Sequence, residues 1–215
     1  MDIKDILSKV DHTLLNPKAT WEEIKNICDD GMKYCTASVC IPPSFVKRAK
    51  EYVGENLKIC TVIGFPLGAN TSAVKAFETK DAIANGADEI DMVMNIGALK
   101  DKNYDLVRDD VKAVVEAANG TLVKVILETC LLTEDEIKKA CELCVEAKAD
   151  YVKTSTGFST RGATIEDVRI MKEAVHGKAK VKAAGGVRTP EDMVKIVAAG
   201  ADRIGTSAGC SLVKK

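Results

Sequence analysis

The stretch DYVKTSTGFS, residues 150–159, places a lysine inside a short β-branched run that ends in a glycine-containing turn. A run of this kind, bounded by turn residues, is typical of a buried strand. The same order of β-rich run, small loop and amphipathic helix recurs along the chain. The candidate strands cover residues 9–15, 34–40, 58–64, 89–95, 122–129, 151–156, 180–185 and 203–207. This repetition predicts an α/β fold, a closed (β/α)8 TIM barrel, better than an open doubly wound sheet.

Helix signals lie between these strands. N-caps are predicted at Thr20, Thr133, Thr164 and Thr189, the last followed by Pro190 at the first turn. Helix ends are predicted at Gly31, Gly86, Gly120 and Gly200, because glycine adopts the left-handed cap conformation most easily. Apolar residues at helical spacing near the start predict a short extra helix, and residues 208–215 form at most a short final helix.

Length and charge set the class of protein. A chain of 215 residues with no linker or low-complexity tract predicts one domain, residues 1–215. The 31 basic and 32 acidic side chains give a net charge of −1 without a basic run, so no nucleic-acid or membrane partner is expected. An anionic ligand must therefore be bound by a local site.

The compartment is predicted from apolar runs and cysteines. The first residues carry Asp2, Lys4, Asp5 and Lys9, unlike a signal peptide, and no later run reaches the length of a membrane span, so we expect a cytoplasmic protein. The eight cysteines are then expected to be reduced thiols. Cys141 and Cys144 form a CxxC inside a helical pattern, which favours packing over redox chemistry.

Lysines within three candidate strands are the first functional signal. Strand side chains in a barrel alternate between lumen and helices, so if Val152 faces the helices, Lys153 faces the lumen. The same alternation turns Lys182 inward on the next strand. Burial and a neighbouring like charge both favour a neutral amine, which is the nucleophilic form toward a carbonyl. Alternatively, these lysines reach solvent at strand ends or form buried ion pairs with Glu128 or Asp91.

Other polar residues follow the same strands. Asp91 lies in mid-strand, and a buried carboxylate needs a partner, so it either pairs with a lysine or moves protons at a bound substrate. Asp11 holds a similar position on the first strand. Cys40 could line the open end of the barrel at the carboxyl ends of the strands, although a buried thiol more often serves packing.

Glycines after three strands predict an anion site. Gly157, Gly185, Gly186, Gly205 and Ser207 follow strand ends where barrel phosphate sites are built. Arg188 either assists them or lies at the surface. The sequence contains no HxxxH, HExxH or carboxylate cluster with metal spacing, so neither a metal nor a cofactor is predicted.

Several motifs in order resemble the deoxyribose-phosphate aldolase family of class I aldolases. They are DHTLL, ASVCIPPSFV, VIGFPLGAN, GADEIDMVMNIG, KVILETCLLT, YVKTSTGFS, VKAAGGVRT and RIGTSAG, which together run nearly end to end. The resemblance implies reversible cleavage of 2-deoxy-D-ribose 5-phosphate to D-glyceraldehyde 3-phosphate and acetaldehyde. We also expect a homo-oligomer, a dimer or tetramer.

The resemblance assigns roles to residues. The family's Schiff-base lysine matches Lys153. Its second lysine, whose charge favours the neutral form of the Schiff-base lysine, matches Lys182. Its acid/base aspartate matches Asp91. Supporting polar groups match Asp11, Thr13 and Lys124, and the phosphate loops match the glycines and Ser207 named above. Arg161 stands where a smaller residue is expected beside those loops.

Three alternatives stay open on the sequence. The first is a Schiff-base aldolase for a different phosphorylated aldehyde, which the lysines and glycines alone would not exclude. The second is a sugar-phosphate isomerase with a carboxylate base and no covalent lysine. The third is a barrel that binds phosphate without catalysis.

Overall fold

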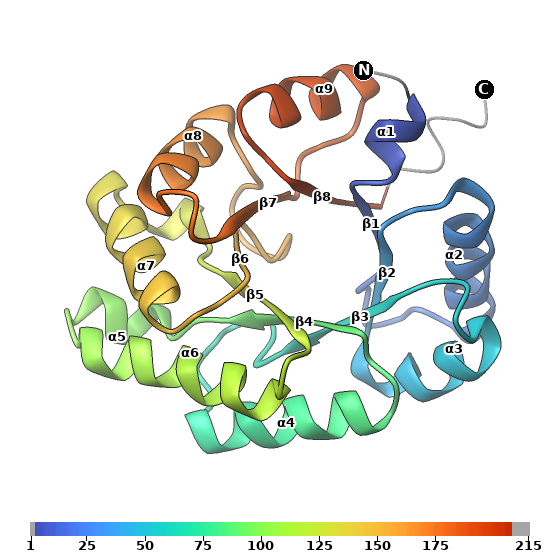
Figure 1. Ribbon diagram of the computed structural model, residues 1–215, viewed down its shortest axis with the longest axis horizontal. Coiled ribbons are helices and arrows are strands. Elements are labelled where there is room, and N and C mark those ends of the chain that lie inside the picture. The colour runs from blue at the N-terminus through green and yellow to red at the C-terminus, as the bar shows by residue number, and fades with distance from the viewer. Residues whose placement is uncertain (1–2, 208–215) are drawn as a thin grey trace.

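The eight strands close into a parallel barrel in sequential order, β1 to β8 (Figure 1). The computed structural model describes residues 3–207. The strands are β1 Val10–Thr13, β2 Ser38–Ile41, β3 Ile59–Ile63, β4 Glu89–Val93, β5 Leu122–Ile126, β6 Tyr151–Lys153, β7 Lys180–Ala184 and β8 Arg203–Thr206. The predicted (β/α)8 barrel is therefore confirmed.

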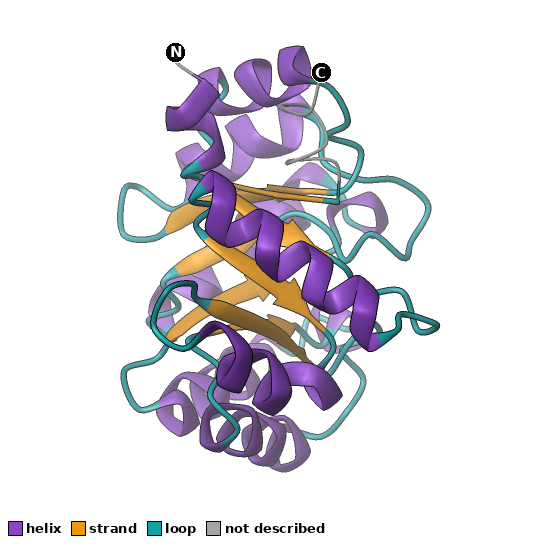
Figure 2. Ribbon diagram, turned by 90° about the vertical axis from the view of Figure 1, so that its right-hand side faces the viewer, coloured by secondary structure: helices purple, strands orange, loops and turns teal. Residues whose placement is uncertain are grey.

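Helices surround the barrel on its outside (Figure 2). They are α1 Ile3–Leu7, α2 Trp21–Tyr34, α3 Val46–Val53, α4 Ser72–Ala84, α5 Ile96–Lys100, α6 Tyr104–Ala118, α7 Glu134–Glu146, α8 Ile165–Ala174 and α9 Pro190–Ala198, with short 3₁₀ turns η1 Pro43–Phe45 and η2 Thr129–Leu131. No helix between residues 3 and 207 combines the length and apolar character that crossing a bilayer requires.

Local sequence explains where most helices begin. The side chains of Thr20, Thr133, Thr164 and Thr189 each accept a hydrogen bond from the backbone N–H three residues on, and an acidic side chain at that position returns the contact. These capping boxes satisfy N–H groups that have no partner within the helix. All four predicted N-caps are confirmed.

The chain around the second strand differs from the prediction. The predicted strand 34–40 begins only at Ser38, because α2 continues through Tyr34 and ends at Cys35, which has a left-handed backbone with φ of 53°. The predicted helix end at Gly31 was wrong, since Gly31 lies inside α2. A Cβ there would come within 2.8 Å of the Leu57 side chain, so this glycine permits close packing rather than capping. Gly86, Gly120 and Gly200 do follow helix ends with positive φ.

The predicted N-terminal helix is present as α1, where Ile6 and Leu7 are buried against the core. The predicted final helix at 208–215 lies outside the described residues.

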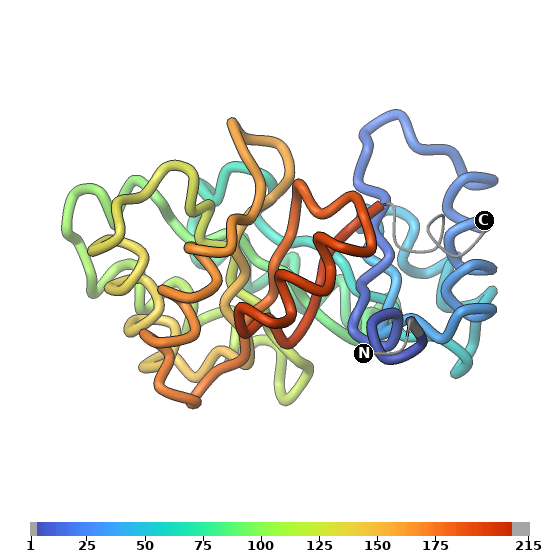
Figure 3. The backbone as a smooth tube through the Cα atoms, turned by 90° about the horizontal axis from the view of Figure 1, so that it is seen from above, coloured from blue at the N-terminus to red at the C-terminus, as the bar shows by residue number. Residues whose placement is uncertain are grey.

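Alternation along the strands separates two environments. Val152, Val181 and Ile204 belong to the apolar layer between strands and helices. Their neighbours in sequence, such as Lys153 and Lys182, point into the lumen, which therefore contains charged groups. Parallel pairing places Lys153 and Lys182 directly opposite each other on β6 and β7. The loops after β1 and β6, blue and orange in Figure 3, project from the same end of the barrel.

Candidate active site

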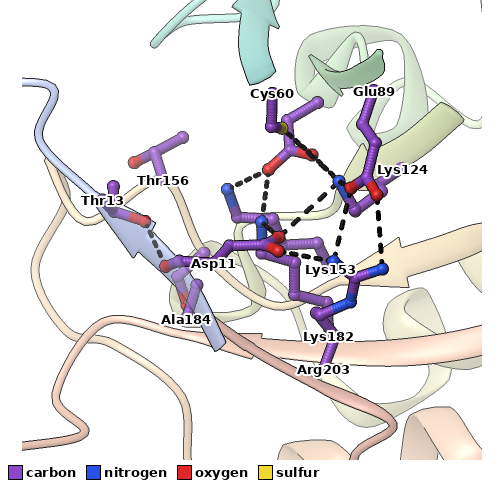
Figure 4. A network of polar contacts seen from close by, with 12 residues as sticks. Asp11, Thr13, Cys60, Glu89, Lys124, Lys153, Thr156, Lys182, Ala184 and Arg203 are labelled. Carbon is purple, nitrogen blue, oxygen red and sulfur yellow. Dashed lines mark hydrogen bonds and ion pairs between the residues drawn. The ribbon is translucent and has the colours of Figure 1, made fainter. Parts of the chain in front are cut away.

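Within residues 3–207, seven charged side chains from six strands meet inside the barrel, and Figure 4 shows contacts among them. The cations are Lys124, Lys153, Lys182 and Arg203, and the carboxylates are Asp11, Glu89 and Asp91. Burying single charges would cost several kcal/mol each, so their mutual contacts are necessary for folding.

Asp91 is the centre of this network. Its Oδ2 atom accepts hydrogen bonds from Lys153 Nζ at 2.7 Å and from Lys182 Nζ at 2.8 Å. Its Oδ1 atom accepts one from Lys124 Nζ at 2.9 Å and is 3.2 Å from Cys60 Sγ. Burial by itself would raise the pKa of Asp91, but the charges of the three lysines outweigh burial and hold that pKa well below its ordinary value.

Asp11 supports Lys182 from the other side. Its Oδ2 atom contacts Lys182 Nζ, while its Oδ1 atom accepts from Arg203 at 2.6 Å and from the Ser38 hydroxyl at 2.8 Å. The pKa of Asp11 lies below its ordinary value because these cations outweigh the effect of burial. Burial would lower the pKa of Lys182, yet the charges of Asp11 and Asp91 raise it above its ordinary value. Lys182 is therefore a fixed positive charge beside Lys153.

Lys153 differs from the other lumen cations. Within residues 3–207 it contacts one carboxylate, Asp91, whereas Lys124, Lys182 and Arg203 each contact two or more. It also lines an open cavity of about 470 Å³ at the loop end of the barrel, which the other three do not. Lys124, Lys182 and Arg203 balance the charges of the three carboxylates, so Lys153 is the cation in excess within this network.

The same cavity contains the predicted anion-binding residues. Its wall includes Thr13, Thr156, Gly157, Gly185, Gly186, Arg188, Gly205 and Ser207. Gly157, Gly185 and Gly186 have φ of 88°, 76° and 79°, a conformation that L side chains rarely adopt. A Cβ on Gly185 would lie 3.1 Å from the Gly162 Cα, so the two loops approach backbone to backbone. At these glycines no side chain separates the backbone from the cavity.

Three supporting residues predicted from sequence take different positions. The Thr13 hydroxyl lies at the cavity wall and donates to the Asp11 carbonyl at 2.8 Å. Lys124 lies deeper and is fully buried, 2.6 Å from Glu89 Oε2. Cys40 is buried with Cys60 and Val62 and does not line the cavity.

Among the residues that the structure describes, two sets of side chains have the spacing of metal ligands, namely Cys40 with Cys60 and Asp91, and Asp11 with Cys60 and Glu89. The carboxylates in both sets are already bonded to ammonium or guanidinium groups. These donor sets are therefore a poor fit for a metal ion.

Sequence reasoning missed Glu89 and Arg203 as lumen residues. Glu89 lies two residues before Asp91, and Arg203 two residues before Gly205, so alternation places each on the same face as a predicted site residue. That signal was available in the sequence.

Glu128, which the sequence offered as a possible partner of the strand lysines, has a positive φ of 58° and is buried. Its carboxylate accepts hydrogen bonds from the Thr156 N–H, at 3.2 and 3.3 Å, and from the Thr156 hydroxyl. The Phe158 N–H in turn donates to Thr156 Oγ1 at 3.0 Å. Glu128 thus fixes the turn around Gly157 and is not the partner of a lumen lysine.

Arg161 does not line the cavity. Its guanidinium pairs with Asp167 at the start of α8 and donates to the Gly162 carbonyl at 3.1 Å. Arg161 therefore braces the loop after β6 from outside the predicted phosphate contacts.

The lowered pKa values of Asp11 and Asp91 predict how stability depends on pH. Their ionised forms stabilise the folded state fully above about pH 4, and this contribution is lost as the pH falls through the lowered values. Between those lowered pKa values and about pH 4, the unfolded chain binds more protons than the folded chain, so the free energy of unfolding rises with pH. We expect Asp11→Asn to reduce the slope of unfolding free energy against pH by about 1.4 kcal/mol per pH unit below pH 4. Urea titrations from pH 2.5 to 6 measure both slopes, and equal slopes would contradict the assignment.

Comparisons with known proteins identify the family of this chain. A family model described as DeoC/LacD family aldolase matches residues 6–214. The deoxyribose-phosphate aldolase of Exiguobacterium sp. is 61% identical over 206 residues, covering 95% of this chain and 93% of the relative. The deoxyribose-phosphate aldolase of Clostridioides difficile is 53% identical over 212 residues, covering 99% and 97%.

A solved structure is also similar. The tetrameric deoxyribose phosphate aldolase of Aeropyrum pernix superposes with a TM-score of 0.93 at 33% identity, covering 99% of this chain and 91% of that one. Fold, family model and relatives agree over nearly the whole length, and the chain therefore belongs to the DeoC/LacD family of aldolases.

Proposed function

We propose that this chain reversibly cleaves 2-deoxy-D-ribose 5-phosphate to D-glyceraldehyde 3-phosphate and acetaldehyde, through a Schiff base on Lys153. The names of the relatives support the substrate. The observation that carries the mechanism is that Lys153, alone among the lumen cations of residues 3–207, lines the cavity that also contains the glycine loops.

The first step forms the covalent intermediate. The neutral Lys153 amine attacks the C1 aldehyde of the open-chain sugar, and loss of water from the carbinolamine gives an iminium. Asp91 Oδ2 is 2.7 Å from Lys153 Nζ, so it can accept the proton that leaves the attacking nitrogen. Lys182, bonded to the same oxygen, stabilises Asp91 in its ionised form between these transfers.

The second step breaks the C2–C3 bond. Loss of the proton from the C3 hydroxyl turns C3 into the aldehyde of glyceraldehyde phosphate, and the bonding electrons move into the iminium to give an enamine. Protonation of C2 and addition of water then release acetaldehyde and restore the amine. Asp91 lies behind Lys153 and does not line the cavity, so we propose that water carries protons between Asp91 or Lys182 and the substrate. The iminium is the electron sink, so this route needs no metal or cofactor.

The direct test is product analysis. The purified protein should convert 2-deoxyribose 5-phosphate to equal amounts of acetaldehyde and glyceraldehyde phosphate, followed by NMR, with the same rate in EDTA. Ribose 5-phosphate is the matched comparison. A protein that cleaves neither of the two sugars would contradict the proposal.

The phosphate role of the loops predicts a selective effect at Gly157. Alanine at this position meets no atom within 4 Å but must adopt φ near 88°, which disfavours the native turn by about 1–2 kcal/mol. We expect Gly157→Ala to raise KM for 2-deoxyribose 5-phosphate about tenfold, while kcat/KM for unphosphorylated 2-deoxyribose changes less than twofold.

A matched control is Gly120→Ala. Gly120 has φ of 92°, open space around the added Cβ, and a position after α6 outside the cavity wall. It should leave both substrates unaffected. Equal losses on both substrates in Gly157→Ala would contradict a phosphate role for the loop.

Three further properties stay predictions. The homo-oligomeric state is supported by the tetrameric relative from Aeropyrum pernix. We also propose that residues 1–215 form one domain and that the protein is cytoplasmic.

A further inference from the structure

Glu89 and Arg203 lie in the lumen away from the cavity. The Lys124 ammonium is 2.6 Å from Glu89 Oε2, and the Arg203 guanidinium is 3.4 Å from Glu89 and 2.6 Å from Asp11. Neither Glu89 nor Arg203 lines the cavity. The mechanism above does not use either residue, although both contribute a full charge to a low-dielectric interior.

Both residues are connected to Lys153 through short contacts. From Glu89 the path runs through Lys124 to Asp91, and from Arg203 it runs through Asp11 and Lys182 to the same carboxylate. Asp91 Oδ2 then bonds Lys153. A change of charge at either end therefore reaches Lys153 directly by Coulomb interaction and through the positions of these groups.

The balance of charges gives the sign of each effect. The charged and titratable groups of the lumen network that ends at Lys153 are Asp11 on β1, Cys40 on β2, Cys60 on β3, Glu89 and Asp91 on β4, Lys124 on β5, Lys182 on β7 and Arg203 on β8. With Lys153 neutral, three cations face three carboxylates. Removing the Glu89 charge leaves a positive excess, which disfavours a protonated Lys153. Removing the Arg203 charge leaves a negative excess, which favours it.

We propose that Glu89 and Arg203 together set the pH at which Lys153 becomes the reactive neutral amine, and that they act in opposite directions without touching the substrate. This inference rests on the proposed function, in which the neutral Lys153 amine begins the reaction. Two lumen residues that do not line the cavity, Glu89 and Arg203, would then control the pH dependence of activity.

The test compares Glu89→Gln with Arg203→Gln. The readout is kcat/KM between pH 5 and 10 for unphosphorylated 2-deoxyribose, because a phosphate group titrates near pH 6 and would obscure the profile. The acidic limb is the low-pH side of this profile, where kcat/KM rises as Lys153 loses its proton. We expect this limb to move to lower pH in Glu89→Gln and to higher pH in Arg203→Gln, each by about one pH unit. A shift of this size is what a single charge gives at a separation on the order of 10 Å and an effective dielectric constant of about 20.

Two further variants separate charge from structure. The double variant Glu89→Gln with Arg203→Gln restores the wild-type balance, so its limb should return to within about 0.3 pH units of the wild type. Arg203→Lys retains the charge with a different shape and should also keep the wild-type limb. These two variants test the proposal even where a single variant is too unstable to assay, because a limb shifted by a full unit in either would contradict it.

A matched control lies outside the lumen. Asp110 is as buried as Glu89 and pairs with Lys75 of α4, whose ammonium also donates to the Val93 carbonyl at the end of β4. Asp110→Asn removes one buried carboxylate charge at a comparable structural cost and should leave the acidic limb in place. If Asp110→Asn shifts the limb as far as Glu89→Gln, the effect is general destabilisation and the proposal is overturned.

The outcomes distinguish this inference from the proposed function. Absence of a reducible adduct on Lys153 in the wild type would overturn the function itself. An adduct on Lys153 together with unshifted limbs, or with limbs shifted in the same direction in both single variants, would overturn only the role of Glu89 and Arg203.

Discussion

Lys153→Leu should lower the rate of 2-deoxyribose 5-phosphate cleavage by at least about 10⁴-fold, because leucine cannot form an imine and no other lumen amine reaches the cavity within the described residues. The variant should fold, since Asp91 keeps Lys124 and Lys182 as partners after Lys153 is removed. The measurements are single-turnover cleavage and a circular dichroism spectrum of the same sample.

Lys153→Arg is the matched control for charge. Arginine keeps a positive group near Asp91 but cannot serve as the imine-forming amine, so it should be as inactive as leucine. A Lys153→Leu protein with more than a tenth of the wild-type rate would show that the reaction does not depend on this amine.

The second large effect is expected at Lys182. Lys182→Met should lower kcat/KM at pH 7 by about 10²–10³-fold. The raised pKa of Lys182 keeps it charged through neutral pH, and this charge favours the neutral form of Lys153 beside it. Removing it should also move the acidic limb of the pH profile upward by more than one pH unit, the same direction as for Arg203→Gln.

A loss of structure would give a different pattern. Asp11 keeps Arg203 and Ser38 as partners in Lys182→Met, so the barrel should remain closed. A rate that is reduced equally at every pH, with the acidic limb unmoved, would assign Lys182 a purely structural role.

The barrel was predictable because each unit carries its own signals. Threonine caps, apolar periodicity and glycines at strand ends are local features, and they located all eight strands. The error at residues 34–37 has a physical cause. Tyr34 and Cys35 have sequence preferences compatible with a strand, but Gly31 allows α2 to pack closely on Val39 and Leu57, and the helix continues past it. That packing depends on residues distant in sequence.

The site was predictable to the extent that alternation determines it. Alternation correctly turned Lys153 and Lys182 into the lumen, where both contact Asp91. It could not say which carboxylate each lysine would contact, because partners on β1, β4 and β8 come together only when the barrel closes. Glu128 shows the same limit, since no local signal predicts a positive φ at a glutamate or its hydrogen bonds to Thr156.

Reductive trapping tests the central claim most directly. The wild-type protein is incubated with acetaldehyde and borohydride, digested, and analysed by peptide mass spectrometry, with Lys153→Leu treated in parallel. The proposed mechanism predicts one ethyl group on the peptide that contains Lys153 and no adduct on the peptides that contain Lys124 or Lys182. A wild-type protein that is not modified at Lys153, or is modified at another lumen lysine instead, would contradict the mechanism.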